Sequence, residues 1–111
     1  MISSPKLSFL PPEIFDQAMQ VDELDLEKSM NVLPPFKSSR FVVYAGQTSP
    51  LDVHAVKECW FIASGEGTLY YDQDSGHKIS QGDVLYFDAN ISHRVHNTGM
   101  ADLIVFSVWW G

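Results

Sequence analysis

Short segments rich in β-branched and aromatic residues recur through the second part of this chain, and turn-forming residues separate them. These segments are residues 40–45, 58–63, 68–71, 77–79, 84–87, 92–96 and 102–109. Short strands spaced by about 8 to 12 residues are typical of all-β sandwiches and closed barrels. No convincing helical pattern follows residue 37. The sequence therefore predicts an all-β domain over residues 38–111.

The first part of the chain, residues 1–37, is acidic and interrupted by prolines. Pro11 and Pro12 suit the first turn of a short helix. Four apolar residues then share one face at helical spacing: Ile14, Phe15, Ala18 and Met19. Asp22 is expected to cap a second short helix. We therefore expect a partly helical N-terminal extension, either an arm that packs on the sheet or on a partner subunit, or a lid over a site.

Charge excludes two classes of partner. The 111 residues include 7 Lys or Arg and 14 Asp or Glu, for a formal charge of −7. Six of the acidic residues and one lysine lie in residues 11–30, so that stretch alone carries −5. A chain of this charge is a poor ligand for nucleic acid or for an anionic membrane. No apolar run approaches the roughly 20 residues that span a bilayer.

The cysteine content and the N-terminal residues indicate the cellular compartment in which the protein is expected. The single cysteine, Cys59, excludes an intrachain disulfide. The first residues contain one lysine, and the proline pair interrupts their apolar stretch, which is unlike a secretory signal. We expect a cytoplasmic protein.

Histidines and carboxylates form two clusters at metal-ligand spacing. Asp52 and His54 are two residues apart, so an extended chain points both side chains to one face, and Glu58 begins the next strand. His93 lies in a second cluster on a later strand. Two imidazoles and one or two carboxylates facing into one barrel would suit a first-row divalent metal. Taken alone, such a pattern is more often a surface turn.

The glycine spacing strengthens the metal interpretation. The first cluster is Gly46, five residues, Asp52-x-His54, three residues, Glu58, six residues and Gly65. The second is Gly82, five residues, Asp88-x-Asn90, two residues, His93, three residues and Asn97. These spacings resemble the two motifs of the cupin superfamily, G-x5-H-x-H-x3,4-E-x6-G and G-x5-P-x-G-x2-H-x3-N. The resemblance covers about residues 40–110 and implies a double-stranded β-helix, the jelly-roll or cupin barrel.

The chain departs from those motifs at three positions. Asp88 and Asn90 replace a proline and a glycine at a turn, and both residue types tolerate turn geometry. Asp52 replaces the first histidine of the family's site. By position, the resemblance implies the ligand set Asp52, His54, Glu58 and His93. Alternatively, the replaced histidine marks a barrel that has lost its metal.

The ligand chemistry favours particular ions. Two carboxylates offset the charge of a divalent ion and favour Fe(II) or Mn(II), while Ni(II) and Zn(II) are also compatible. If Asp52 does not bind the metal, two histidines and one carboxylate remain, the facial set of non-haem iron oxygenases.

Aromatic residues in the strands are candidates for lining a pocket around the metal. Four are singled out: Tyr44, Trp60, Tyr86 and Phe106. Strand alternation places Trp60 on the face of Glu58. Alternation also sends one of Trp109 and Trp110 inward and the other outward. Most such rings simply fill a core, so each remains a candidate.

The sequence supports two functional hypotheses. The first is a metal-dependent enzyme acting on a small molecule, either a dioxygenase or a Lewis-acid isomerase, cyclase or lyase. The second is a non-catalytic barrel, with or without metal, that binds a sugar-like or other small ligand. The resemblance to small single-domain cupins also implies a homodimer, and exposed edge strands give such a barrel a physical reason to pair.

Overall fold

The computed structural model describes residues 4–72 and 75–111. Residues 1–3 of the expected extension and residues 73–74 therefore lie outside the described residues. The predicted all-β class is confirmed, and each of the seven predicted segments corresponds to a strand. Those strands are β3 (Lys37–Val43), β4 (Lys57–Ser64), β5 (Glu66–Tyr71), β6 (His77–Ser80), β7 (Val84–Phe87), β8 (His93–Asn97) and β9 (Leu103–Trp110).

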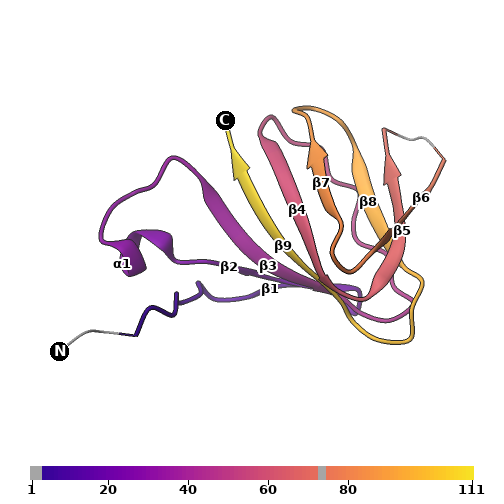
Figure 1. Ribbon diagram of the computed structural model, residues 1–111, viewed down its shortest axis with the longest axis horizontal. Coiled ribbons are helices and arrows are strands. Elements are labelled where there is room, and N and C mark those ends of the chain that lie inside the picture. The colour runs from indigo at the N-terminus through magenta and orange to yellow at the C-terminus, as the bar shows by residue number, and fades with distance from the viewer. Residues whose placement is uncertain (1–3, 73–74) are drawn as a thin grey trace.

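Two antiparallel sheets form the barrel. The larger has six strands in the order β1-β2-β3-β9-β4-β7, in which β1 is Glu13–Phe15 and β2 is Met19–Glu23. The smaller has three in the order β6-β5-β8. The C-terminal strand β9 lies between β3 and β4, so the two ends of the barrel domain meet within one sheet (Figure 1). This order is that of a double-stranded β-helix, as predicted.

Strand alternation decides which side chains form the core. In β4, Glu58, Trp60 and Ile62 are buried, whereas Lys57 and Phe61 are exposed. Both sheets direct one face toward a shared core of ten buried apolar residues. The larger sheet contributes Phe41, Val43, Trp60, Ile62, Phe87, Leu103 and Val105, and the smaller contributes Leu69, Ile79 and Val95.

The N-terminal extension differs from the prediction. Where a helix is expected after the proline pair, two strands form instead, β1 (Glu13–Phe15) and β2 (Met19–Glu23). They turn at Asp16, which has a positive φ, and β2 pairs with β3 along five residues. A helix this short is marginal in isolation, whereas the edge of β3 supplies backbone partners. The helical prediction for residues 11–19 was therefore wrong.

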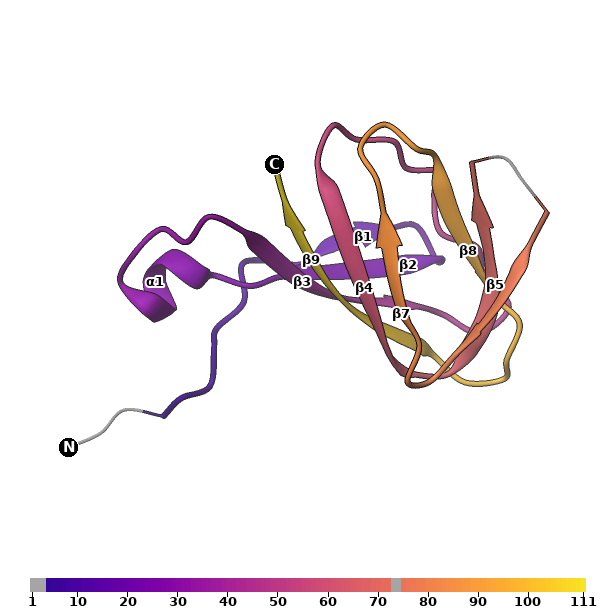
Figure 2. The same cartoon turned by 45° about the horizontal axis from the view of Figure 1, so that its top comes forward.

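A helix does follow, but its cap is a different aspartate. The one helix of the described chain, α1, spans Leu26–Met30, and Asp25 accepts a hydrogen bond from the Lys28 amide at 3.1 Å. Asp22, the expected cap, is paired instead with Arg40 at 3.5 Å. Among the described residues, no helix has the length and apolar character to cross a membrane. The α1 helix and the N-terminal segment project beyond the barrel (Figure 2), and the molecule with this projection is 50 Å along its longest axis.

Candidate metal centre

Asp52 and His93 face each other because their backbones pair. Asp52 lies in the connection between β3 and β4, and His93 begins β8. Each amide donates to the other residue's carbonyl, at 2.9 and 3.0 Å, which forms an isolated antiparallel bridge. Directly opposed residues in such a bridge have neighbouring side chains. A local pairing of two distant segments thus brings these residues to one point.

His54 lies in the same connection. Its carbonyl accepts a hydrogen bond from the Asn90 amide at 2.7 Å, which ties the loop to the turn before β8. Asn90 has a φ of +64°, so the left-handed turn geometry expected for this glycine replacement is present. The turn therefore holds His54 in place through the backbone.

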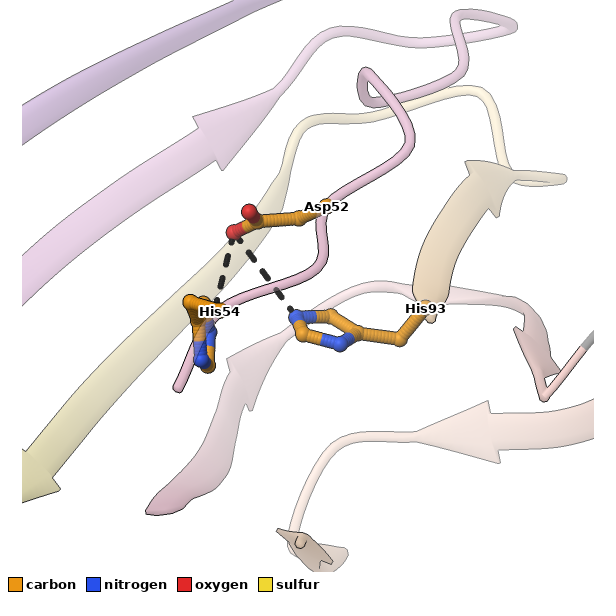
Figure 3. Close-up of side chains that lie close together, drawn as sticks. All are labelled: Asp52, His54 and His93. Atoms are coloured by element: carbon orange, nitrogen blue, oxygen red, sulfur yellow. Dashed lines mark ion pairs between the residues drawn. The ribbon is translucent and has the colours of Figure 1, made fainter. Parts of the chain in front are cut away.

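The three side chains converge (Figure 3). Asp52, His54 and His93 each offer one ligand atom, and these atoms lie within 4.8 Å of one another. The Asp52 Oδ2 atom lies 3.8 Å from His54 Nε2 and 3.9 Å from His93 Nε2. This arrangement is a candidate metal-binding triad, and it contains the aspartate that replaces the motif histidine.

Backbone carbonyls fix both imidazole rings. His54 Nδ1 donates to the Val56 carbonyl at 3.0 Å, and His93 Nδ1 donates to the Ile91 carbonyl at 3.2 Å. Each ring therefore presents Nε2 to the centre. Metal-binding histidines usually use the second nitrogen in this way, because the hydrogen bond fixes the tautomer and the ring orientation. The donor set thus fits a divalent ion.

Glu58 is the second carboxylate at the centre. Its Oε1 atom lies 3.0 Å from His54 Nε2 and 3.5 Å from His93 Nε2. The side chain is buried on the inner face of β4, while Asp52 is more than half exposed. The structure therefore brings all four predicted ligand residues to one place, with Glu58 on the inner side and Asp52 toward solvent.

Electrostatics couple these groups. Burial raises the pKa of Glu58, but hydrogen bonding to His93 and His54 and the nearby Trp60 N–H outweigh it, so the pKa is lowered overall. Burial lowers the pKa of His93, but Glu58, the Ile91 carbonyl and Asp52 reverse this, so that pKa is raised. Both shifts favour a protonated His93 facing an ionised Glu58, and an ion that binds His93 Nε2 would have to displace that proton.

A cavity of about 450 Å³ opens beside the triad. Cavities of this size are usual for small-molecule sites. Trp60 lines it, as predicted from its shared face with Glu58, and so does Trp109, the inward member of the terminal tryptophan pair. Trp110 points outward and lies near Tyr86, with 6.4 Å between the ring centroids.

Three of the four aromatic residues proposed for the pocket do not line it. Tyr86 and Phe106 are 50% and 41% exposed on the outer face of the larger sheet. Strand parity explains both positions, because Tyr86 is paired with the outward Cys59 and Phe106 lies between the buried Val105 and Ser107. Tyr44 follows the inward Val43 and is also absent from the lining. Those assignments were wrong.

The sequence interpretation missed other lining residues. Phe15, Met19 and Val21 come from the N-terminal strands, which the sequence suggested were helical. Ser39 and Ser107 interrupt apolar strands at inward positions. A serine at an inward position of an otherwise apolar strand was the available signal for the last two.

Comparisons with known proteins agree with this architecture. A family model described as "Cupin domain" matches residues 39–109. A predicted oxalate decarboxylase from Thermotoga maritima is 23% identical, with a TM-score of 0.75 over 99% of this chain and 97% of that one. A Cupin 2 conserved barrel domain protein from Salinispora arenicola is 27% identical, with a TM-score of 0.74 over 86% and 78%.

A third solved structure, a protein from Photorhabdus luminescens, is 16% identical, with a TM-score of 0.77 over 100% of this chain and 85% of that one. At such identities the likeness concerns the fold.

Proposed function

Since the chain belongs to the cupin domain family, we propose that it is a metal-dependent protein acting on a small molecule. One divalent ion would be held by Asp52, His54, Glu58 and His93. The observation that carries this proposal is the convergence of two Nε2 atoms and a carboxylate oxygen beside a cavity of about 450 Å³. Because both Nδ1 atoms are bonded to backbone carbonyls, the Nε2 atoms are oriented for an ion.

The donor chemistry supports Fe(II) or Mn(II). The set holds two imidazole nitrogens and two carboxylates, and the free cysteine, Cys59, alternates with the inward Glu58 and Trp60 on β4. Nitrogen and oxygen donors without sulfur suit these ions, and Ni(II) or Zn(II) also fit. A bound divalent ion would supply Lewis-acid polarisation of a substrate oxygen, and iron(II) would add oxygen chemistry.

The chain's own residues have separate tasks in this proposal. Glu58 lies on the buried side, where its carboxylate faces both imidazoles and would offset the charge of a bound ion. Asp52, being exposed, is the carboxylate nearest to solvent. Trp60 and Trp109 line the adjoining cavity and supply apolar surface to it. The arrangement is consistent with dioxygenase chemistry or with Lewis-acid isomerisation, cyclisation or lysis.

One observation favours a second candidate, a non-catalytic binding barrel. His54 Nε2 and Glu58 Oε1 are already 3.0 Å apart, so these groups satisfy each other without an ion. The same cavity would then bind a small ligand, sugar-like or otherwise, without turnover. Oxygen uptake by Fe(II)-loaded protein with phenols, enols and thiols would identify an oxygenase, because neither a binding barrel nor a Lewis-acid isomerase consumes oxygen.

The test of the metal proposal is elemental mass spectrometry on protein purified without a His tag, followed by calorimetric titration with Mn(II). We expect about one equivalent of ion, and His93→Ala should reduce the affinity at least about tenfold. His77→Ala is the matched control, because His77 is exposed at the start of β6. Less than about a tenth of an equivalent, with no titratable site, would contradict the proposal.

We also propose that the chain pairs with a second copy through the outer face of the larger sheet. Five apolar side chains on this face are between 36% and 61% exposed: Phe61, Val84, Tyr86, Phe106 and Trp110. Register makes them contiguous, since Phe61 is opposite both Val84 and Phe106. Their exposed area is roughly 400 Å², about half of what one partner contributes to a standard interface.

Analytical ultracentrifugation tests this pairing. The unmodified protein should sediment as a dimer, and Phe61→Glu should shift it to monomer. Val53→Glu is the control, because Val53 is 55% exposed in the connection before β4. A monomer at all concentrations, or a dimer that Phe61→Glu leaves intact, contradicts this interface.

A further inference from the structure

A row of polar side chains crosses the inner face of the larger sheet. Register places Glu23 opposite Ser39, Ser39 opposite Ser107, and Ser107 opposite Trp60. All four residues line the cavity. The row therefore runs from β2, across β3 and β9, to β4, where Trp60 adjoins the metal centre.

The middle of this row is buried and has hydrogen-bonding capacity to spare. Ser39 Oγ and Ser107 Oγ lie 2.7 Å apart, and both residues are at most 2% exposed. Two hydroxyl groups carry two protons, and their mutual bond uses one, so the other can be donated into the cavity. This pair is therefore a potential donor to a bound molecule.

Trp60 supplies a second donor. Its Nε1 atom is buried and has no hydrogen-bond partner of ordinary geometry, although its N–H lies close enough to Glu58 to favour the carboxylate form. The whole residue is 4% exposed. A buried indole N–H without a partner is costly, and an acceptor atom on a ligand would remove that cost.

The charge of the residues that line the cavity limits the charge of a ligand that can bind there. Among the residues that line it, none is Lys or Arg. Four are carboxylates (Glu13, Glu23, Asp52 and Glu58), against the two imidazoles of the metal centre. The rest of the wall is largely apolar, with Phe15, Met19, Val21 and Phe41 among its members. An anionic ligand would find several carboxylates and no fixed cation.

We propose that the cavity selects an uncharged, largely apolar small molecule whose carbonyl or hydroxyl oxygen accepts hydrogen bonds from Trp60 and the Ser39–Ser107 pair. This inference rests on the proposed function only in assigning the other end of the molecule to the metal centre. Trp60 lies directly opposite Ser107, and adjacent strands are about 4.8 Å apart, so one ligand oxygen between these two strands can accept from both donors. An aryl ketone, a phenol or an alcohol has the required chemistry.

A pair of isosteric probes tests the charge selection. The ketone 2-acetonaphthone and the anion 2-naphthoate differ mainly in a methyl group replaced by a charged oxygen. In EDTA-treated protein, calorimetry should show the ketone binding at least about tenfold more tightly than the anion. The same titrations in Zn(II)-loaded protein show whether an ion changes this preference.

Amide and indole NMR signals test the donors. On ¹⁵N-labelled protein, the ketone should shift the Trp60 indole N–H signal, which Trp60→Phe assigns. The double variant Ser39→Ala/Ser107→Ala should weaken ketone binding about tenfold with little loss of stability, because it removes both hydrogen-bonding partners together. Ser80→Ala on β6 is the matched control, since Ser80 is exposed in the other sheet.

Three results would overturn the inference: no ketone binding up to its solubility limit, equal or tighter binding of the anion in metal-free protein, or an unchanged ketone affinity in the double serine variant. Failure of the metal proposal gives a different result. In that case Zn(II) does not titrate, while the metal-free protein still prefers the ketone. Glu23→Lys adds a cation at the end of the row farthest from Trp60. It should reduce the ratio of ketone affinity to anion affinity in the metal-free protein.

Discussion

Two histidine rings, at the scale of single residues, supply the nitrogen atoms of the candidate metal centre. Each is oriented by a hydrogen bond to a carbonyl two residues away, Val56 for His54 and Ile91 for His93. Because these bonds are local, the orientation follows from short stretches of chain. The two carboxylates differ in burial, and this difference gives each a separate prediction.

Both carboxylates are expected to contribute to ion binding. Asp52→Ala and Glu58→Gln should each lower the Mn(II) affinity by about 10- to 100-fold, measured by calorimetry. Asp102→Asn is the control, because Asp102 is exposed away from the cavity. If Asp52→Ala leaves the affinity unchanged, the ligand set reduces to His54, Glu58 and His93.

Asn90 is held in a left-handed conformation, with a φ of +64°. A side chain without a local hydrogen-bonding group is strained there, so Asn90→Ala should lower the free energy of unfolding by about 1–2 kcal/mol. Asn90→Gly should cost little or nothing, since glycine adopts this geometry freely. Urea denaturation measures both values. Equal stability of the alanine and glycine variants would show that the backbone is not strained.

The strands follow closely from alternation and turn residues, at the scale of secondary-structure elements. The segment predicted at 84–87 is strand β7 with the same bounds, and the others differ by a few residues at their ends. The helix prediction for the N-terminal segment is wrong because the spacing of its apolar residues is compatible with a helix and also with a strand. Pairing with β3, which no local pattern encodes, selects the strand.

The turn between β4 and β5 depends on close packing against β9. Gly65 has a φ of +93°, and a Cβ atom there would lie 2.8 Å from the Asp102 carbonyl oxygen. Gly82 has a similar φ of +94°, but its Cβ position is open. Gly82→Ala should therefore cost about 1–2 kcal/mol of unfolding free energy, from backbone strain alone.

Gly65→Ala should cost distinctly more, because the backbone of β9 must also shift. Chemical denaturation of the two variants side by side measures the difference. If they prove equally stable, the contact with Asp102 relaxes without cost.

A divalent ion should stabilise the fold, at the scale of the whole molecule. The candidate ligands come from the connection before β4, from strand β4 of the larger sheet and from strand β8 of the smaller sheet. An ion bound to them would therefore link the two sheets. An ion that binds only the folded state at a hundredfold its Kd adds about 2.7 kcal/mol. For a domain of this size the melting temperature should rise by about 10 °C.

Differential scanning fluorimetry with and without Mn(II) measures this rise. The variant His54→Ala/His93→Ala should lose it, while His77→Ala should keep it. A rise of the same size in the double variant would place the ion elsewhere on the molecule.

The acidity of the chain also belongs to the whole molecule. Residues 11–30 carry −5 of the −7 formal charge. The N-terminal strands add two of the cavity's four carboxylates, Glu13 and Glu23. The extension therefore contributes to the charge of the cavity, a role that sequence position alone did not indicate.

The sequence by itself determined the seven strands β3 to β9 and the four residues of the candidate metal centre. Strand bounds depend on alternation and turns within a few residues, and the ligands were found because their spacing matches the cupin motifs. Only the tertiary structure decided what surrounds them. Tyr86 and Phe106 face outward because of the register with β4, and Ser39 meets Ser107 because strands 68 residues apart in sequence lie side by side. Such pairings are set by the cooperative packing of distant segments, which no local pattern records.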